Sequence, residues 1–381
     1  MVKVAHLITR LDFGGAQANT LYTVARLDHS RFDALIVAGP GGILDSRGEP
    51  GRLLHASLLR REISPVGDLA ALLQLRAVLA GLKPVIVHTH SSKAGILGRL
   101  AAALAKSPVV VHTFHGFGFH PLQNPLKRGF FVLLEKLCAR FSDALIFVSR
   151  ANMETARAAG IGDPAKYRLI RSGVKLAGYP AKIDRAAVRA RLGLAPDDVV
   201  TLSIGNAKPQ KNPGHFLEAA ARISARLPAA KFVFVGGGEE LPALRAEAAA
   251  RGLEKTCLFP GWREDTPELL AASDIFALTS LWEGLPRSLV EALKTGLPAV
   301  CYRTDGVADL LRDGVNGFCV PQGDLDAFCS SLESVVADAP LRARLAAGAA
   351  AADLAEFDID FMVRQQEELY AELLRQKGYA G

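Results

Sequence analysis

Residues 85–114 read VIVHTHSSKAGILGRLAAALAKSPVVVHTF, and this stretch decides the fold class. Its two ends, Val85–His90 and Val109–Phe114, are apolar at consecutive positions, which is typical of strands buried on both faces of a parallel sheet. Between them, Lys93–Ala105 has the length and composition of a helix. A strand, a helix and a second strand in this order predict a βαβ unit of a doubly wound sheet.

The same alternation extends in both directions along the chain. In the first half, further strands are predicted at Val2–Thr9, Asp33–Ala38 and Ala144–Ser149, and further helices at Ala16–Leu27, Leu69–Leu79, Leu126–Arg140 and Ala151–Ala159. In the second half, strands are predicted at Val199–Ile204, Lys231–Val235, Thr256–Phe259, Ile275–Thr279, Ala299–Tyr302 and Gly317–Val320, with helices between them.

A chain of 381 residues predicts two domains at roughly 150 residues each. Residues 172–184 lack clear periodicity and are the best linker, so we place the boundary near residue 180. We expect a first domain over 1–180 and a second over 181–357, with the C-terminal segment 358–381 packed back on the first domain. The predicted fold is therefore α/β, with two doubly wound, Rossmann-like domains that face a central cleft.

The composition is that of a globular protein, since half of the residues are hydrophobic and 22% are charged. The formal net charge of +6 suits an anionic small molecule or a membrane surface, and it is too diffuse to indicate nucleic acid. The five cysteines form no CxxC pair, which indicates reduced core residues. No stretch approaches roughly 18 uninterrupted apolar residues, so we expect a cytoplasmic protein, either free or peripheral on the membrane.

Candidate ligand-binding residues follow the predicted strands of the first half. Gly14 and Gly15 open a helix, where backbone N–H groups can approach a phosphate; a tight turn is the alternative. His88 and His90 share one face of a strand, which favours polar contacts over a metal site, because no nearby Asp, Glu or Cys completes a ligand set. His115, at the lip of the next strand, could move a proton or stabilise charge, or be a structural histidine.

Two loops of the second half follow strands in the same way. Residues 205–213 carry Lys208 and Lys211 where a helix opens, which is a natural phosphate site or a solvated loop. The glycines at 236–238 lack the rest of a dinucleotide-binding pattern and indicate a turn. Asp358 and Asp360 resemble a metal-binding pair, but capping of the last helix explains them more simply.

The most specific pattern is SLWEGLPRSLVEA at 280–292, directly after a predicted strand. Glu283 is expected in the loop, Pro286 at the first helical position, and Glu291 about two turns inside the helix. This spacing predicts one carboxylate at the mouth of the helix and a second on the same broad face, where carboxylates could bind sugar or ribose hydroxyl groups. Free N–H groups after Gly284 would surround the ligand.

Together these residues resemble the retaining glycosyltransferases of family 4, which have the GT-B fold. The resemblance runs in order along nearly the whole chain: the Gly14-Gly15 loop, HTHSSKAGILGRLAA at 88–102, HTFHG at 112–116, the 205–211 loop, FPGWRED at 259–265 and EGLPRSLVEAL at 283–293. It implies a sugar transferred, with retention of configuration, from a nucleoside-diphosphate sugar held mainly by the second domain. It implies no cofactor and no metal, because fixed positive charge and backbone dipoles assist departure of the diphosphate.

The resemblance also implies roles for individual residues. Glu283 contacts the transferred sugar near its reacting carbon, and His115 faces the same sugar. Lys211 binds the diphosphate, Glu291 the ribose, and the turn at 262–263 borders the base. The implied donor-binding residues are Gly14, Gly15, Asn206, Lys208, Lys211, Trp262, Arg263, Gly284, Leu285 and Glu291.

One position departs from the family pattern. Asn206 stands where the family usually has an arginine, so a forked, permanent cation is missing. Lys208 is near enough in sequence to compensate, or the donor is held in another way. The base and the sugar of the donor are therefore not defined by the motif residues.

The segment Leu126–Arg140 bears on the acceptor. It carries four basic residues against the single Glu135, interleaved with apolar side chains, and such a helix can lie on an anionic membrane or simply pack on the sheet. Chains with the HTFHGFGF pattern are similar to enzymes that build bacterial exopolysaccharide, lipopolysaccharide or other lipid-linked glycans, so we expect a glycan or polyprenyl-linked acceptor and no nucleic acid. The alternatives are a GT-B sugar-nucleotide epimerase and a catalytically silent, nucleotide-sugar-binding partner of a synthase.

Overall fold

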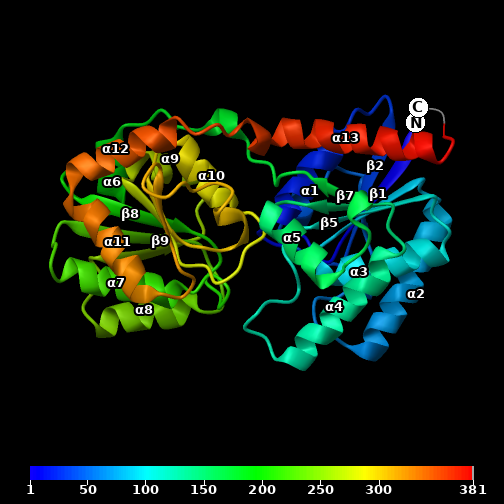
Figure 1. The fold of residues 1–381 in the computed structure, drawn as a ribbon, viewed down its shortest axis with the longest axis horizontal. Helices are drawn as coiled ribbons and strands as arrows, with labels where there is room; N and C mark the ends of the chain where they lie inside the picture. The colour runs from blue at the N-terminus through cyan, green and yellow to red at the C-terminus, as the bar shows by residue number, and fades with distance from the viewer. Residues whose placement is uncertain (380–381) are drawn as a thin grey trace. The chain divides into compact units, whose positions relative to one another are not determined.

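The computed structural model describes residues 1–379 and divides into two compact α/β units, each built on a parallel sheet (Figure 1). The first unit comprises Met1–Gly173 and the residues from Glu356 onward, and the second comprises Val174–Ala355. The division lies inside the predicted linker, a few residues before residue 180. Residues just after it belong to the second unit because Tyr179 forms a hydrogen bond with Glu291 there.

The first unit contains a 7-stranded sheet with the order β3-β2-β1-β4-β5-β6-β7. Its strands are β1 Val2–Ile8, β2 Phe32–Ala38, β3 Leu53–His55, β4 Ile86–His90, β5 Val109–Phe114, β6 Ala144–Phe147 and β7 Tyr167–Leu169. Strands β4, β5 and β6 are buried throughout, which agrees with their continuous apolar runs.

Six helices cover this sheet: α1 Gly15–Arg26, α2 Pro65–Leu82, α3 Ser92–Leu104, α4 Pro125–Ala139, α5 Arg150–Ala159 and α13 Ile359–Gln376. Helix α13 lies beside α1 (Figure 1) and packs its apolar face on β1, β4 and β5. Helices α2 and α3 pack on the other face. The last helix of the chain is thus part of the first unit, and Asp358 caps it by accepting hydrogen bonds from the backbone N–H groups of Asp360 and Phe361.

The second unit contains a 6-stranded sheet with the order β10-β9-β8-β11-β12-β13. Its strands are β8 Val199–Ile204, β9 Ala230–Val235, β10 Cys257–Gly261, β11 Ile275–Leu278, β12 Ala299–Tyr302 and β13 Gly317–Val320. Its helices are α6 Arg185–Arg191, α7 Pro213–Ser224, α8 Leu241–Ala250, α9 Thr266–Ala272, α10 Arg287–Lys294, α11 Leu325–Ala337 and α12 Ala339–Ala350.

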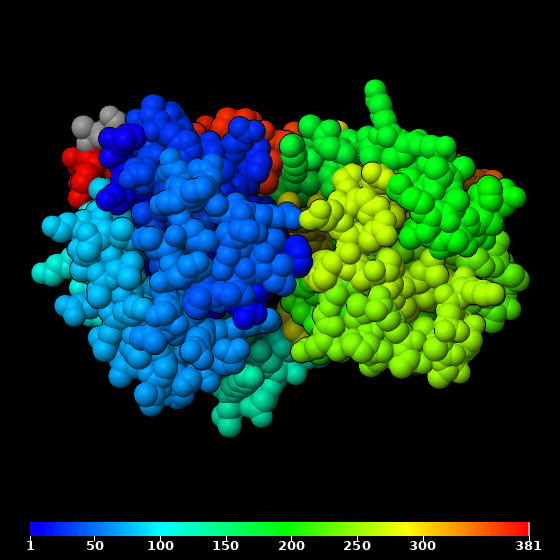
Figure 2. Space-filling view, turned by 180° about the vertical axis from the view of Figure 1, so that it is seen from behind, coloured from blue at the N-terminus to red at the C-terminus, as the bar shows by residue number. Residues whose placement is uncertain are grey.

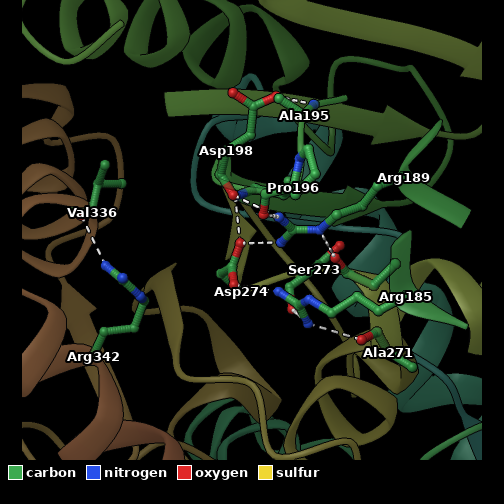
Figure 3. Close-up of polar contacts among 12 residues, drawn as sticks. Arg185, Arg189, Ala195, Pro196, Asp198, Ala271, Ser273, Asp274, Val336 and Arg342 are labelled. Carbon is green, nitrogen blue, oxygen red and sulfur yellow. Dashed lines mark hydrogen bonds and ion pairs between the residues drawn. The ribbon is translucent and has the colours of Figure 1, made fainter. Parts of the chain in front are cut away.

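A buried arginine ties the two central strands of the second sheet together at their amino ends (Figure 3). The Arg189 guanidinium lies 2.6 Å from the Asp274 carboxylate and also donates to the carbonyl oxygens of Pro196 and Asp198. Asp274 in turn accepts a hydrogen bond of 2.7 Å from the backbone N–H of Val200. The polar groups of these residues are thus paired with one another at the amino ends of the strands.

In both sheets the strands that directly follow the first strand in sequence are added on one side of it, and the later strands are added on its other side. The neighbours β1 and β4 in the first sheet, and β8 and β11 in the second, are therefore topological switch points. The loops that follow such a pair of strands diverge and leave a crevice at the carboxyl edge of the sheet. Most of the motif residues follow these four strands, whereas His115 follows β5 and Trp262 and Arg263 follow β10.

Several sequence-based boundaries need correction. The strand predicted at Ala144–Ser149 ends at Phe147, because Ser149 instead caps α5 by accepting a hydrogen bond from the Asn152 N–H. Helix α10 begins after Pro286, so Glu291 lies little more than one turn inside it, not two. The short strands β3 and β7 were not predicted, since three residues carry too little periodicity.

All five cysteines are free and buried, as expected for reduced core residues. Among the described residues, α2 is the one helix long and apolar enough to cross a membrane, by length and composition alone. Its Ala71, Leu75 and Leu79 are buried against the first sheet, so one face of α2 serves the fold.

Candidate functional site

The central feature of the second unit is an ion pair at the carboxyl edge of its sheet. Lys211 lies on the loop after β8, and its ammonium group contacts the carboxylate of Glu283, which lies on the loop after β11. Both side chains are mostly buried, with 15% and 7% of their surfaces exposed. The Thr279 hydroxyl supports the loop, since it lies 3.0 Å from the carbonyl oxygens of Lys211 and Asn212. The structure thus brings together two of the predicted site residues.

Three consecutive glycines, at 236–238, lie against the loop that leads to Lys211 and against Trp262. A Cβ on Gly236 would lie 1.8 Å from the carbonyl oxygen of Gly205, and Gly236 adopts a φ of +148°. A Cβ on Gly237 would lie 2.4 Å from the indole nitrogen of Trp262. The turn predicted at 236–238 is present, and glycine is required because the neighbouring loop and Trp262 approach the backbone directly.

Asp305 is a member of this site that the motif analysis missed. Its carboxylate accepts a hydrogen bond of 3.2 Å from the backbone N–H of Glu283. Burial raises the pKa of Asp305 to about 6, and the nearby charge of Glu283 adds to the effect. Asp305 follows β12, so it reaches the site only through the alignment of β11 with β12. No sequence signal joins the two residues.

Glu291 lies on α10, partly buried, with the Tyr179 hydroxyl as a hydrogen-bond partner. Burial raises the pKa of Glu291, while the charge of Arg287 and the bond from Tyr179 oppose that rise. Helix α10 has no side-chain cap at its start, where the segment after Gly284 meets it. Such helix starts offer backbone N–H groups to an anion.

The remaining predicted donor-binding residues lie on the same edge but differ in their surroundings. Asn206 and Lys208 are partly buried on the loop after β8. Arg263 pairs with Asp265 at 2.6 Å within its own turn, so its charge is already partly neutralised. Leu285 is buried with 8% exposed. Lys211 is therefore the cation that the structure places against Glu283.

In the first unit, the predicted residues lie at the carboxyl edge of the other sheet. Gly14 is exposed in an extended conformation and precedes α1, whose start has no side-chain cap. A Cβ on Gly14 would lie 2.4 Å from the side-chain oxygen of Gln17. The Gly14-Gly15 turn therefore presents backbone rather than side chain, as a phosphate-binding turn requires.

His115 contacts a group of buried histidines. Its Nε2 lies 3.1 Å from Nδ1 of His90, and Nε2 of His90 lies 3.0 Å from Nδ1 of His6. His88 bonds to the hydroxyl groups of Tyr370 and Thr113. The nitrogens of His6, His88 and His90 all lie within 4.8 Å of one another, a spacing compatible with a metal ligand set. The sequence favoured His88 and His90 as polar contacts in a cleft, but both are buried, and it missed His6, which completes this group of three. Their nitrogens form hydrogen bonds with each other and with hydroxyl groups.

A surface hollow of about 780 Å³ lies in the second unit beside Asp274, lined among others by Arg185, Leu297 and Arg342 (Figure 3). It is at the amino ends of β11 and β12, since Asp274 and Leu297 precede those strands. The motif residues follow the strands instead. The hollow is therefore on the edge of the sheet opposite the candidate site.

Comparison with known proteins assigns the family. The model described as "Glycosyl transferases group 1" matches residues 184–351, and the model described as "Glycosyl transferase 4-like domain" matches residues 14–173. The chain is 36% identical over 342 residues to the UDP-Gal:alpha-D-GlcNAc-diphosphoundecaprenol alpha-1,3-galactosyltransferase of Escherichia coli, with 88% of each chain covered. This chain belongs to the group 1 glycosyltransferases of the family 4 type. The predicted family is confirmed.

Other relatives and solved structures agree with this assignment. The putative glycosyltransferase EpsD of Bacillus subtilis is 28% identical and covers 73% of this chain and 74% of its own. Anabaena Alr3699/HepE, solved in complex with UDP and glucose, superposes with a TM-score of 0.83 at 22% identity and covers 98% of this chain and 100% of its own. At that identity the likeness shows the fold alone, and the fold is GT-B.

Proposed function

We propose that this glycosyltransferase moves a hexose, with retention of anomeric configuration, from a UDP-sugar to a sugar joined through diphosphate to a polyprenyl lipid. The observation that carries the proposal is the Lys211–Glu283 pair at the switch point of the second sheet. The name of the E. coli relative gives a UDP-Gal donor and a diphosphoundecaprenol-linked acceptor, which supports this choice of substrates. UDP-galactose is therefore the first donor to test.

The geometry suggests how the departing diphosphate is stabilised. The ion pair with Glu283 holds the Lys211 ammonium group at the carboxyl edge before a ligand arrives, so little reorganisation is needed when negative charge develops. The uncapped start of α10 supplies backbone N–H groups. With these positive groups available, we propose that transfer requires neither a metal nor another cofactor. Full activity after treatment with EDTA is the expected result.

The sugar itself is handled by carboxylate and imidazole groups in this proposal. Glu283 contacts the sugar near the reacting carbon, and His115 contacts one of its hydroxyl groups. Glu291 binds the ribose, where its partly buried position next to Tyr179 suits a hydrogen bond to a hydroxyl group. Asn206 stands where the family usually has an arginine. We assign the role of that arginine's positive charge to Lys211 together with Lys208.

A purified-enzyme assay tests the reaction. The chain is incubated with UDP-galactose, UDP-glucose or UDP-N-acetylglucosamine and a synthetic GlcNAc-diphosphate-lipid, and the product linkage is determined by NMR. Donor binding is followed separately by thermal denaturation, because a donor at a hundred times its Kd stabilises the fold by about 2.7 kcal/mol. For a protein of this size that is roughly 3 °C in Tm. An inverted linkage, or conversion of the donor without any acceptor, would overturn the proposal, and the second outcome would favour an epimerase.

We further propose that α4 binds the enzyme to an anionic membrane. Leu126, Phe130, Leu133 and Leu137 follow one another at intervals of four, three and four residues, which places them on one face of the helix, and they are 84%, 57%, 63% and 42% exposed. Figure 2 shows the teal segment near the start of α4 projecting from the edge of the first unit. An exposed apolar stripe of this kind indicates an interaction surface.

The charges around this stripe select the partner. Lys127, Arg128, Lys136 and Arg140 are all exposed. The one acidic residue, Glu135, points into the protein, where it pairs with the fully buried Arg99 at 2.5 Å. The surface of α4 is therefore entirely basic and apolar, a combination that fits a leaflet with anionic lipids. Cytoplasmic-face, peripheral attachment would bring the enzyme to a lipid-linked acceptor.

Helix α2 also exposes apolar side chains. Val66, Leu69 and Leu73 are exposed on α2, and α3 packs between α2 and α4 on one face of the first sheet (Figure 1). The apolar composition of α2 thus has an explanation other than a membrane span: one face of the helix packs on the sheet and the other lies toward lipid in this proposal.

A further inference from the structure

The peptide unit that leads into Glu283 is held at both of its ends. The carbonyl oxygen of Trp282 accepts a hydrogen bond of 2.7 Å from the side-chain amide of Gln210. The N–H of Glu283, in the same peptide unit, donates to the Asp305 carboxylate at 3.2 Å. A trans peptide is planar and its C=O and N–H point in opposite directions, so the two side chains act from opposite sides. The two contacts form a clamp that fixes the orientation of this peptide.

Both sides of the clamp come from segments that are themselves anchored. Gln210 lies on the loop after β8, and its own carbonyl oxygen accepts a hydrogen bond of 2.8 Å from the Leu281 N–H. Asp305 follows β12, whose register with β11 pairs Leu278 with Cys301. Strands β8 and β12 flank β11 in the sheet. The turn between β11 and α10 is therefore bonded to the loop on each side of it.

The peptide unit between Gly284 and Leu285 is fixed by the same loop after β12. Gly306 donates its N–H to the carbonyl oxygen of Gly284 at 3.1 Å. A Cβ at Gly306 would lie 2.5 Å from that oxygen and 2.8 Å from Cα of Leu285, closer than side-chain carbons come to backbone atoms. Glycine is therefore required at 306. Because the Gly284 C=O and the Leu285 N–H belong to one peptide unit, the Leu285 N–H points away from Gly306.

These contacts leave other N–H groups of the turn free. Among the residues that the structure describes, no group accepts a hydrogen bond from four of them, those of Gly284, Leu285, Arg287 and Ser288. Residues 283–286 are buried, and buried N–H groups without an acceptor are rare in proteins. Anions accept hydrogen bonds from such groups at the start of a helix. The clamp thus uses one N–H group of the turn and leaves its neighbours for an anionic ligand.

The clamp requires an oxygen acceptor from Asp305 and not a charge. Burial and the nearby charge of Glu283 raise the pKa of Asp305 to about 6. In the carboxylate and in the carboxylic acid alike, an oxygen remains that can accept from an N–H group. The side-chain amide of asparagine offers the same acceptor, whereas leucine has nearly the same size and offers none. These two replacements therefore separate the hydrogen bond from the volume of the side chain.

We propose that Gln210 and Asp305 are positioning residues that clamp the peptide unit before Glu283 and thereby place its carboxylate. In the same proposal, Gly306 directs the Leu285 N–H to the donor diphosphate. The roles of Glu283 and of the diphosphate rest on the proposed function, whereas the clamp is a property of the protein alone.

Hydrogen exchange of the substrate-free protein, measured by mass spectrometry on peptides that cover residues 279–290, tests the clamp. Asp305→Leu removes the acceptor, so the amide hydrogens of the turn should exchange about tenfold faster than in the wild type. Asp305→Asn keeps the acceptor and should exchange as the wild type does. Equal exchange in Asp305→Leu and the wild type overturns the clamp. If Asp305→Leu does not fold, Gln210→Met gives the same test from the half-buried end of the clamp.

Steady-state kinetics separate the two parts of the proposal. Misplacement of Glu283 should lower kcat of Asp305→Leu and Gln210→Met by about ten- to a hundredfold, with the donor KM little changed. Gly306→Ala should instead raise the donor KM, by about tenfold if one hydrogen bond to the diphosphate is lost. If kcat is as low in Asp305→Asn as in Asp305→Leu, the charge and not the acceptor is required, and the positioning role is wrong. An unchanged donor KM in Gly306→Ala overturns the role of Gly306.

Asp313→Leu is the matched control. The Asp313 carboxylate also accepts a hydrogen bond from a backbone N–H, that of Cys319 at 2.9 Å, but Asp313 precedes β13 on the amino edge of the same sheet. Its replacement should leave kcat and the exchange of the turn unchanged, and an equal loss of kcat in both leucine variants would show a general effect on stability and overturn the positioning role. If the wild type turns over no donor while the exchange results are as expected, the proposed function is wrong and the clamp still holds.

Discussion

Lys211→Met is expected to separate two roles of the Lys211 ammonium group: pairing with Glu283 in the fold, and binding the donor diphosphate. Methionine keeps most of the side-chain volume and removes the charge, so Glu283 remains mostly buried without its partner. Removal of one partner of a buried ion pair costs about 3–5 kcal/mol. The residual exposure of Lys211 reduces this, and we expect the free energy of unfolding to fall by roughly 2–4 kcal/mol, or about 2–5 °C in Tm.

The double variant Lys211→Met with Glu283→Gln removes both charges, so it should be more stable than the sum of the two single changes predicts. A coupling free energy of about 1–3 kcal/mol is expected from urea denaturation of the four proteins. Activity should not return with stability. Loss of a buried charge partner of the donor diphosphate costs about 2–5 kcal/mol. That corresponds to a decrease in kcat/KM of some thirtyfold to several-thousandfold.

The control cycle uses Arg157 and Glu154, an exposed i,i+3 pair on α5 at 2.7 Å. Its coupling should stay below about 0.5 kcal/mol, the range for surface pairs. Two results would refute the reasoning. Additive stability changes at Lys211 and Glu283 would show that the pair contributes nothing, and near-normal kinetics of Lys211→Met would show that the diphosphate is bound elsewhere.

Three further predictions concern the carboxylates of the candidate site and the proposed membrane surface. Glu283→Gln should lower kcat with little change in KM, whereas Glu291→Gln should raise the donor KM. Initial rates over a range of donor concentrations measure both constants, and equal behaviour of the two variants would contradict this division of roles. Lys127→Glu with Arg128→Glu should reduce sedimentation with anionic liposomes at low salt and leave UDP binding unchanged; if the wild type also stays in the supernatant, the apolar stripe does not bind lipid. Asp305→Asn should stabilise the protein increasingly between pH 4 and pH 7, because the native carboxyl group, with its pKa raised to about 6, binds a proton more tightly than the unfolded one. The wild type loses the stabilisation from this bound proton as pH rises through 6, so the difference in unfolding free energy between the variant and the wild type should grow to about 2–3 kcal/mol. An equal difference at pH 4.5 and pH 7.5 would contradict the raised pKa of Asp305.

The sequence predicted the elements of this fold well because buried parallel strands consist of consecutive apolar residues. Val109–Phe114, Val199–Ile204, Ala299–Tyr302 and Gly317–Val320 have the predicted bounds. The end of the sixth strand was misplaced because Ser149 is used as a helix cap, and a cap competes with strand propensity only in the folded chain. The position of Glu291 within α10 was wrong for a related reason, since Pro286 precedes the helix instead of opening it.

The candidate site was partly predictable. Lys211 and Glu283 were found from loops that follow strands, and the structure brings them into contact. Asp305 was missed because it belongs to no motif and approaches Glu283 only across the pairing of β11 with β12. Glu135 was counted as a surface charge of its helix, although it lies inside against Arg99, because sequence periodicity does not say which polar side chain finds a buried partner.

The sequence by itself determined the family, the alternation of strands and helices, and which loops carry chemistry, because these depend on local residue patterns. The tertiary structure decided which distant side chains meet. His6, His90 and His115 lie in one line only because the sheet places β1 beside β4 and β4 beside β5, and Tyr370 joins them only because α13 returns to the first unit. Side chains that interact across a parallel sheet are separated by a whole helical crossover in sequence, so no local pattern can show the contact.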